Sequence, residues 1–122
     1  MVRVLKLLVV SALFSPSALA NDRCLGIDGE FFSGGTVGRF TSESCEVSRG
    51  FFNNGVEVTL TYDFASGLYR GLGTYPMRPG CLQEFVAHVD QREDGIVWSV
   101  IMLDGNCGLR FGARSSQFYR RR

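Results

Sequence analysis

Glu84 and His88 are two side chains in this 122-residue sequence whose types and spacing could support catalysis. They are four residues apart, so they share a face of the chain in a helix and in a strand alike. A carboxylate beside an imidazole can act as a general acid and base, and a nearby arginine would complete a ribonuclease-like site. The sequence identifies no third group of such a site, and a lone pair of this kind is more often a surface pair. We therefore predict that the protein is not an enzyme.

Other catalytic and cofactor motifs are missing from the sequence. His88 is the only histidine, and no G-x-S-x-G motif marks a hydrolase nucleophile. The glycines between Gly67 and Gly73 match neither a P-loop nor a dinucleotide-binding fingerprint. The cysteine spacings contain no C-x-x-C motif, which disfavours a zinc site. We expect no cofactor and no metal.

Residues 1–20 have the three zones of a secretory signal peptide. Two basic residues precede a short apolar core, and Ala18 and Ala20 fit an A-x-A cleavage site. The apolar core is much shorter than the roughly 20 residues that cross a membrane as a helix. We predict a cleaved signal peptide, no membrane span, and a single secreted β domain over residues 21–122, with the periplasm as the alternative location. The oligomeric state stays open.

Arg120, Arg121 and Arg122 form the one run of like charge in the sequence. Such a run is usually a solvated segment, but it can also contact an anionic partner or surface. Of the 13 basic residues two lie in the signal peptide, so the mature chain carries 11 against 12 acidic residues, a net charge near minus one. That balance does not favour nucleic-acid binding, and no nucleic acid partner is expected.

Four cysteines, Cys24, Cys45, Cys81 and Cys107, lie in the predicted mature chain. Export brings them to an oxidising compartment, where cysteine pairs persist as disulfides. We therefore predict two disulfides, and the spacing leaves all three connectivities open. Each native disulfide in a small exported domain typically contributes about 2 to 5 kcal/mol of stability.

Turn signals recur every eight to twelve residues, a spacing typical of short strands in a sandwich or barrel. Asn53-Asn54-Gly55 between two apolar runs is a strong hairpin signal. The segment 82–89 fits a helical face as well as a strand, and strand is preferred because the rest is β. Candidate strands are residues 28–32, 36–41, 47–52, 56–63, 68–75, 82–89, 96–103, 107–112 and 117–120. The predicted fold is all-β, a small disulfide-bonded sandwich or barrel of about six to eight short antiparallel strands.

Two of these strands should supply much of the core. In residues 56–63 apolar and polar side chains alternate, which directs Val56, Val58, Leu60 and Tyr62 inward. Residues 96–103 are almost continuously apolar, as in a central strand, and Trp98 is expected to fill core space.

Two short segments follow a pattern of cysteines and turns seen in a known family. Residues 24–29, Cys-Leu-Gly-Ile-Asp-Gly, pair a strand-opening cysteine with a glycine turn. Residues 100–109, Val-Ile-Met-Leu-Asp-Gly-Asn-Cys-Gly-Leu, have a strand, a short polar turn and a second strand-opening cysteine. Both segments resemble the MAX effectors of plant-pathogenic fungi, which are small secreted β-sandwiches of six strands.

The resemblance implies a disulfide between Cys24 and Cys107, which leaves Cys45 to pair with Cys81. It also implies a non-enzymatic virulence effector that enters host tissue, binds host proteins and is detected by host immune receptors. An edge strand that adds to a sheet of the partner is one mode of such binding. Two alternatives stay open: a bacterial periplasmic or extracellular inhibitor or binding module, and a small secreted ribonuclease-like hydrolase.

Overall fold

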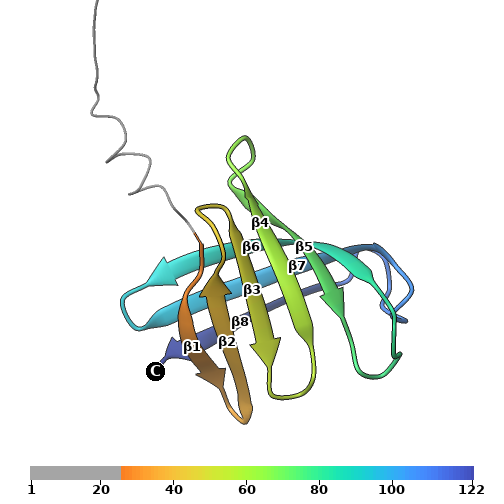
Figure 1. Ribbon diagram of the computed structural model, residues 1–122, viewed down its shortest axis with the longest axis horizontal. Helices are drawn as coiled ribbons and strands as arrows, with labels where there is room; N and C mark the ends of the chain where they lie inside the picture. Colours follow the sequence, from red (N-terminus) through yellow and green to blue (C-terminus); the bar gives the residue numbers. More distant parts are fainter. Residues whose placement is uncertain (1–25) are drawn as a thin grey trace, which may run out of the picture.

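Eight antiparallel strands follow one another along the chain and close into a barrel (Figure 1). The computed structural model describes residues 26–122, so the predicted signal peptide and Cys24 lie outside the described residues. The strands are β1 (Gly29–Ser33), β2 (Thr36–Ser42), β3 (Val47–Phe52), β4 (Glu57–Asp63), β5 (Leu68–Thr74), β6 (Gln83–Arg92), β7 (Gly95–Gly105) and β8 (Arg114–Arg121). The predicted all-β fold is confirmed, as a barrel and with eight strands.

Glycines mark the turns between the first strands. Gly34, Gly55 and Gly67 have φ angles of 59°, 93° and 75°, and they lie in the β1–β2, β3–β4 and β4–β5 turns. An L side chain rarely adopts this left-handed conformation, whereas glycine does so at little cost. The hairpin predicted around residues 53–55 is confirmed by the pairing of β3 with β4, and β1 and β2 form a second hairpin around residues 33–35.

The later part of the chain departs from the prediction at one point. The ambiguous segment 82–89 lies within strand β6 except for Leu82, which directly precedes it, so strand was the right choice. Residues 107–112 form a loop rather than a strand, because Gly108 and Gly112 both have a φ of 83°, which an extended strand does not accommodate. The strand predicted at 117–120 is longer than expected and spans all of β8.

The two ends of the barrel interior differ in how fully they are packed. The end at the β2–β3, β4–β5 and β6–β7 turns, called the packed end, contains Ile27, Ser48, Leu60 and Ile96, all fully buried. The backbone amide of Ile27 donates to Ser48 Oγ at 2.7 Å. The opposite end, at the β1–β2, β3–β4 and β7–β8 connections, is called the open end. Trp98 is partly buried and packs against the core, as predicted for a core residue.

The barrel closes through a short seam between β1 and β8. The two strands pair at two positions, Phe31 with Arg121 and Phe32 with Arg120. In Figure 1, β8 runs behind β1–β3 at a steep angle, which is why the two strands meet over so short a stretch. Every strand has a hydrogen-bonded neighbour on both sides. Closure leaves no strand without a neighbour, but most of β8 is paired on one side only, so partner binding through an edge strand stays a prediction.

The described disulfide joins Cys81 to Cys107, with a Cα–Cα distance of 5.1 Å. The pairing implied by the family resemblance, Cys24 with Cys107 and Cys45 with Cys81, is therefore wrong in both bridges. Cys45 is also disulfide-bonded.

Strand register explains this bridge. Gln83 on β6 pairs with Gly105 on β7. Cys81 lies two residues before Gln83, and Cys107 lies two residues after Gly105, so the antiparallel ladder brings the two cysteines opposite each other. The disulfide therefore joins the β5–β6 and β7–β8 connections at the open end.

Candidate functional site

The candidate acid/base pair lies on the outer surface of β6. Glu84 and His88 are both exposed and point away from the core. Four residues along a strand span about 13 Å, well beyond hydrogen-bond reach. Glu84 lines an outer hollow with Leu72 and Leu103, whereas His88 lines a different one on β6, β7 and β8. The structure thus places the two side chains on one strand but not in one hollow.

The arginine run is part of the barrel wall. Arg120 and Arg121 end strand β8, and their side chains point to opposite faces. The guanidinium carbon of Arg121 lies 4.9 Å from the centre of the Phe31 ring, and those of Arg120 and Arg122 each lie 5.8 Å from the Phe32 ring. These cation–π contacts hold the seam side of the barrel. An anionic contact of these arginines stays a prediction.

A cluster of exposed apolar side chains lies elsewhere, on the outside of the barrel. Phe51, Leu72 and Leu82 are 46%, 44% and 52% exposed and line one shallow hollow of about 130 Å³. We call these three residues the outer patch. They come from β3, from β5 and from the residue just before β6. Segments distant in sequence thus place their apolar side chains around a single point of the surface.

The outward direction of Leu72 follows from the packing of its neighbours. Gly71 faces the barrel interior, and a Cβ atom at this position would lie 2.2 Å from the Phe85 ring. The next glycine, Gly73, is also buried. Because side chains alternate along a strand, Leu72 between these two glycines has to point to solvent. The same alternation turns Phe51 outward beside the buried Gly50.

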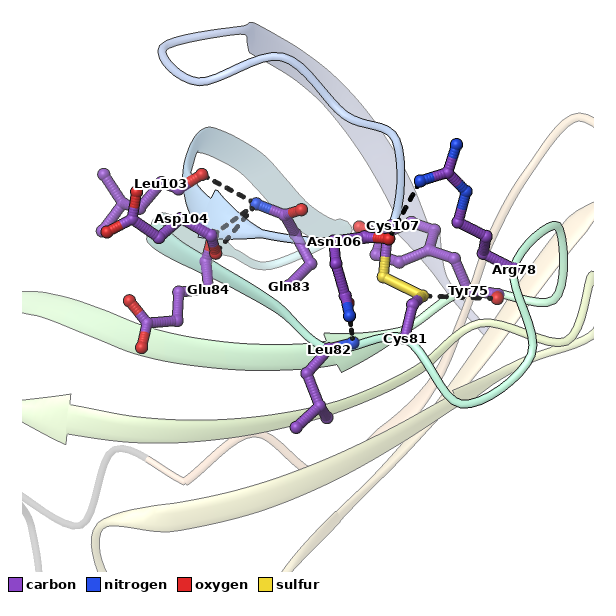
Figure 2. The surroundings of a disulfide bond; sticks show 10 residues. All are labelled: Tyr75, Arg78, Cys81, Leu82, Gln83, Glu84, Leu103, Asp104, Asn106 and Cys107. Carbon is purple, nitrogen blue, oxygen red and sulfur yellow. Dashed lines mark hydrogen bonds between the residues drawn. A yellow bond between two sulfur atoms is a disulfide. The ribbon is translucent and has the colours of Figure 1, made fainter.

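Leu82 is held in its exposed position by covalent and polar contacts (Figure 2). Its neighbour Cys81 is bonded to Cys107, and the Leu82 amide donates to Asn106 Oδ1 at 2.8 Å. The Asn106 amide in turn donates to the Leu82 carbonyl at 3.0 Å. Figure 2 shows the Leu82 side chain pointing away from the disulfide and from Gln83. The backbone that carries this exposed leucine is therefore fixed.

Charges of both signs border the outer patch. Arg49 lies over the Phe51 ring at 5.6 Å and within 3.7 Å of the Glu43 carboxylate. Glu57 on β4 also lines the hollow, and it pairs in register with Phe51 on one side and with Thr74 on the other. Leu72 also lines a second, larger hollow of about 600 Å³ that continues over β4 to β7. The outer patch thus combines three exposed apolar side chains with charged and hydroxyl side chains of the strands between them.

Sequence reasoning missed the outer patch. The pattern that could have found it is alternation: Phe51 and Leu72 each follow a glycine at an inward position, so each falls on the outward face. Leu82 was grouped with Phe85 as part of a helical or strand face. In the structure the two residues lie on opposite sides, Leu82 just before β6 exposed and Phe85 in β6 buried.

In the range 26–122, no three His, Cys, Asp or Glu side chains lie close enough together to hold a metal ion. Over the same residues, no helix has the length and apolar character to span a membrane.

No protein-family model, no curated protein and no solved structure matches this chain.

Proposed function

We propose that this chain is an exported, non-enzymatic protein that acts by binding another protein through the outer patch. The observation that carries the proposal is the arrangement of Phe51, Leu72 and Leu82 around one hollow, with the leucine before β6 fixed by a disulfide and two hydrogen bonds. Exposed apolar clusters with a polar rim are characteristic of protein interaction sites. A fixed anchor loses little conformational entropy when a partner binds.

Export is supported by the signal peptide pattern in residues 1–20 and by the disulfide chemistry. The Cys81–Cys107 bond persists in an oxidising compartment and would be reduced in most cytosols. Export places the outer patch where it meets extracellular, periplasmic or host proteins.

The charged side chains at the outer patch indicate which kind of partner would bind there. Arg49 and Glu57, which both line the hollow beside Phe51, favour a partner that offers an apolar side chain together with an acidic and a basic group. Binding by a sheet face is proposed in preference to the edge-strand mode. In a host plant such a protein would be an effector. In a bacterium it would be an inhibitor or binding module.

Capture with matched variants tests the proposal. The mature protein is immobilised and exposed to a plant extract and, separately, to a bacterial envelope extract. We expect the double variant Leu72→Asp/Leu82→Asp to lose at least tenfold of the captured partner, because charge enters the apolar centre. Phe111→Asp is the control, since Phe111 is 67% exposed in the β7–β8 loop and lies outside the patch. Equal capture by the double variant and the wild type would rule out the outer patch.

The extract that yields the captured protein distinguishes a plant effector from a bacterial inhibitor or binding module. A partner from the plant extract that depends on Leu72 and Leu82 supports the effector reading. A partner from the bacterial envelope with the same dependence supports the inhibitor or binding module. Free wild-type protein must compete for the same partner in either case.

An RNA-cleavage assay tests the non-enzymatic part. We expect no cleavage above background by the wild type, in line with the separation of Glu84 and His88 along β6. Cleavage that disappears in His88→Ala would contradict the proposal and restore the ribonuclease-like alternative.

A further inference from the structure

The barrel interior holds an unfilled cavity at its open end. Its volume is about 330 Å³, and it opens to solvent. Aromatic rings from five positions line it, namely Phe52, Tyr75, Phe85, Trp98 and Tyr119. This cavity lies inside the barrel, whereas the outer patch lies on the outside, so the two features are independent.

The cavity lining carries no charge at neutral pH. Its polar members are hydroxyl and amide side chains, including Asn54, Ser115 and Gln117, and the remainder are apolar or aromatic. Transferring an ion into such surroundings without a counter-charge is costly. A neutral occupant therefore fits the cavity better than an ionised one.

Three polar groups of the lining have no protein partner among residues 26–122. They are the indole N–H of Trp98 and the hydroxyls of Tyr75 and Tyr119. Tyrosine hydroxyls are protonated at neutral pH, and burial raises the pKa of both further, so both can donate. Donors of this kind favour an occupant that carries oxygen acceptors, such as a carbonyl, an ether or a hydroxyl group.

The volume sets the size of the occupant. An apolar protein cavity of about 150 Å³ accommodates benzene. A cavity of about 330 Å³ is roughly twice as large. It therefore has room for a flat molecule of about two rings, at the small end of the range for natural ligand pockets.

The cavity borders the short seam of the barrel. Beyond the Phe32–Arg120 pair, β1 and β8 have no further register pairs, and the next contact is a hydrogen bond from Gln117 Nε2 to Ser33 Oγ at 2.6 Å. Gln117 and Ser115 line the cavity on this side. A side-chain contact is easier to open than a backbone ladder, so the seam is the expected entrance.

From these observations we propose that the barrel interior is a binding site for a small neutral molecule of about two rings that carries an oxygen acceptor. The rings stack among the aromatic side chains around Trp98, and the oxygen accepts from the indole N–H or a tyrosine hydroxyl. Entry is along the β1–β8 seam beside Gln117.

Trp98 provides a direct readout, because it is the one tryptophan in the chain. The test titrates 15N-labelled protein with 2-naphthol, which is neutral at pH 7, and follows the single indole N–H cross-peak by NMR. We expect a saturable shift of this peak. With 2-naphthalenesulfonate, which has the same rings and a permanent charge, we expect at least tenfold weaker binding.

A pair of adjacent variants locates the site. Ser115 lines the cavity and Ser116 points to the outer surface, and both are exposed in β8. Ser115→Phe should weaken 2-naphthol binding at least tenfold by filling the mouth, while Ser116→Phe should leave it within twofold. Circular dichroism confirms that each variant is folded. Val100→Phe, deeper in the cavity, is a second filling variant if Ser115→Phe does not fold.

Three results would overturn the proposal. The first is no shift of the indole peak at millimolar 2-naphthol. The second is equal binding of the neutral and the charged probe. The third is unchanged binding by folded cavity-filling variants, which would place the probe on the outer surface. None of these results affects the outer patch, because Leu72 and Leu82 do not line the cavity.

Discussion

The packed end and the open end of the barrel interior are built by the same eight strands, yet they are filled very differently. At the packed end, Leu60 and Ile96 are fully buried, and Ile27 from the segment before β1 is buried in the same core cluster. At the open end, Met102 and Trp98 are only partly buried and border empty space. The packed end thus contributes most of the core packing, and the open end holds the proposed binding site.

The comparison shows how so small a barrel can hold a cavity. A domain of about 100 residues buries only a modest core and is marginally stable. A void lowers its stability further, because the atoms that line the void lose van der Waals contacts. Here the packed end concentrates the tightest contacts, and the Cys81–Cys107 bond at the open end fixes the loops that would otherwise loosen. The disulfide therefore offsets the loss of packing where the cavity lies.

Removal of this disulfide should have the largest effect. The bond closes a separation of 26 residues, for which chain entropy gives a stabilisation of about 3.5 kcal/mol. Urea unfolding of Cys81→Ala/Cys107→Ala should show a loss of that size. Amide exchange should quicken more in the β7–β8 loop than at Leu60. Uniform acceleration along the chain would show that the bond does not act mainly on the open end.

Truncation of a core side chain should cost more at the packed end. Leu60→Ala removes a fully buried side chain and should lower the free energy of unfolding by about 3 kcal/mol. Met102→Ala borders space that is already empty, and we expect a loss of about 1 kcal/mol. Both values come from urea unfolding midpoints. Equal losses would mean that the two ends are packed alike.

A small addition inside the barrel tests the tight packing of its wall. Gly71→Ala places a methyl group 2.2 Å from the Phe85 ring, an overlap that should cost about 2 to 3 kcal/mol. Gly35→Ala is the control, because nothing lies within 4 Å of its added Cβ and its φ is not left-handed. Thermal unfolding compares the two variants, and similar melting temperatures would contradict the close contact.

Alkaline pH should weaken the packed end. Burial, and to a smaller extent the nearby Tyr62, raises the pKa of Tyr69 to about 12 from its usual 10. The unfolded chain releases this proton near pH 10, so the stability contributed by neutral Tyr69 is complete below pH 10 and is lost as pH rises toward 12. We expect a decrease of about 2 kcal/mol over this interval. In Tyr69→Phe the decrease should be smaller, and an identical pH profile would refute the assignment.

Local patterns in the sequence predicted most of the strands. The strand at residues 47–52 was predicted with its exact bounds, because the hairpin signal at Asn53-Asn54-Gly55 sets where it ends. The loop at 107–112 was mistaken for a strand, since its two left-handed glycines cannot be distinguished by residue type from glycines that lie in strands, such as Gly71.

Pairing between distant segments was harder to predict. The Cys81–Cys107 bridge follows from the β6–β7 register together with one irregularity between Gln83 and Phe85, which shifts the register by one residue. The pattern of residue types does not predict that register shift. The cavity could not be predicted either, because it depends on closure of the barrel. Ser115 and Gln117 face the interior only when β8 pairs with β1.

The seam between β1 and β8 also has a consequence for how the protein is made. Seven of the eight strand pairings join neighbours in sequence, but the pairing of Phe31 with Arg121 spans 90 residues. During synthesis or translocation from the N-terminus, β1 emerges early and stays unpaired on one side until β8 arrives. Its exposed N–H and C=O groups can recruit other chains throughout that delay. Slow elongation is therefore expected to promote aggregation of the nascent chain, and a chaperone that covers β1 would be most useful before the last strand appears.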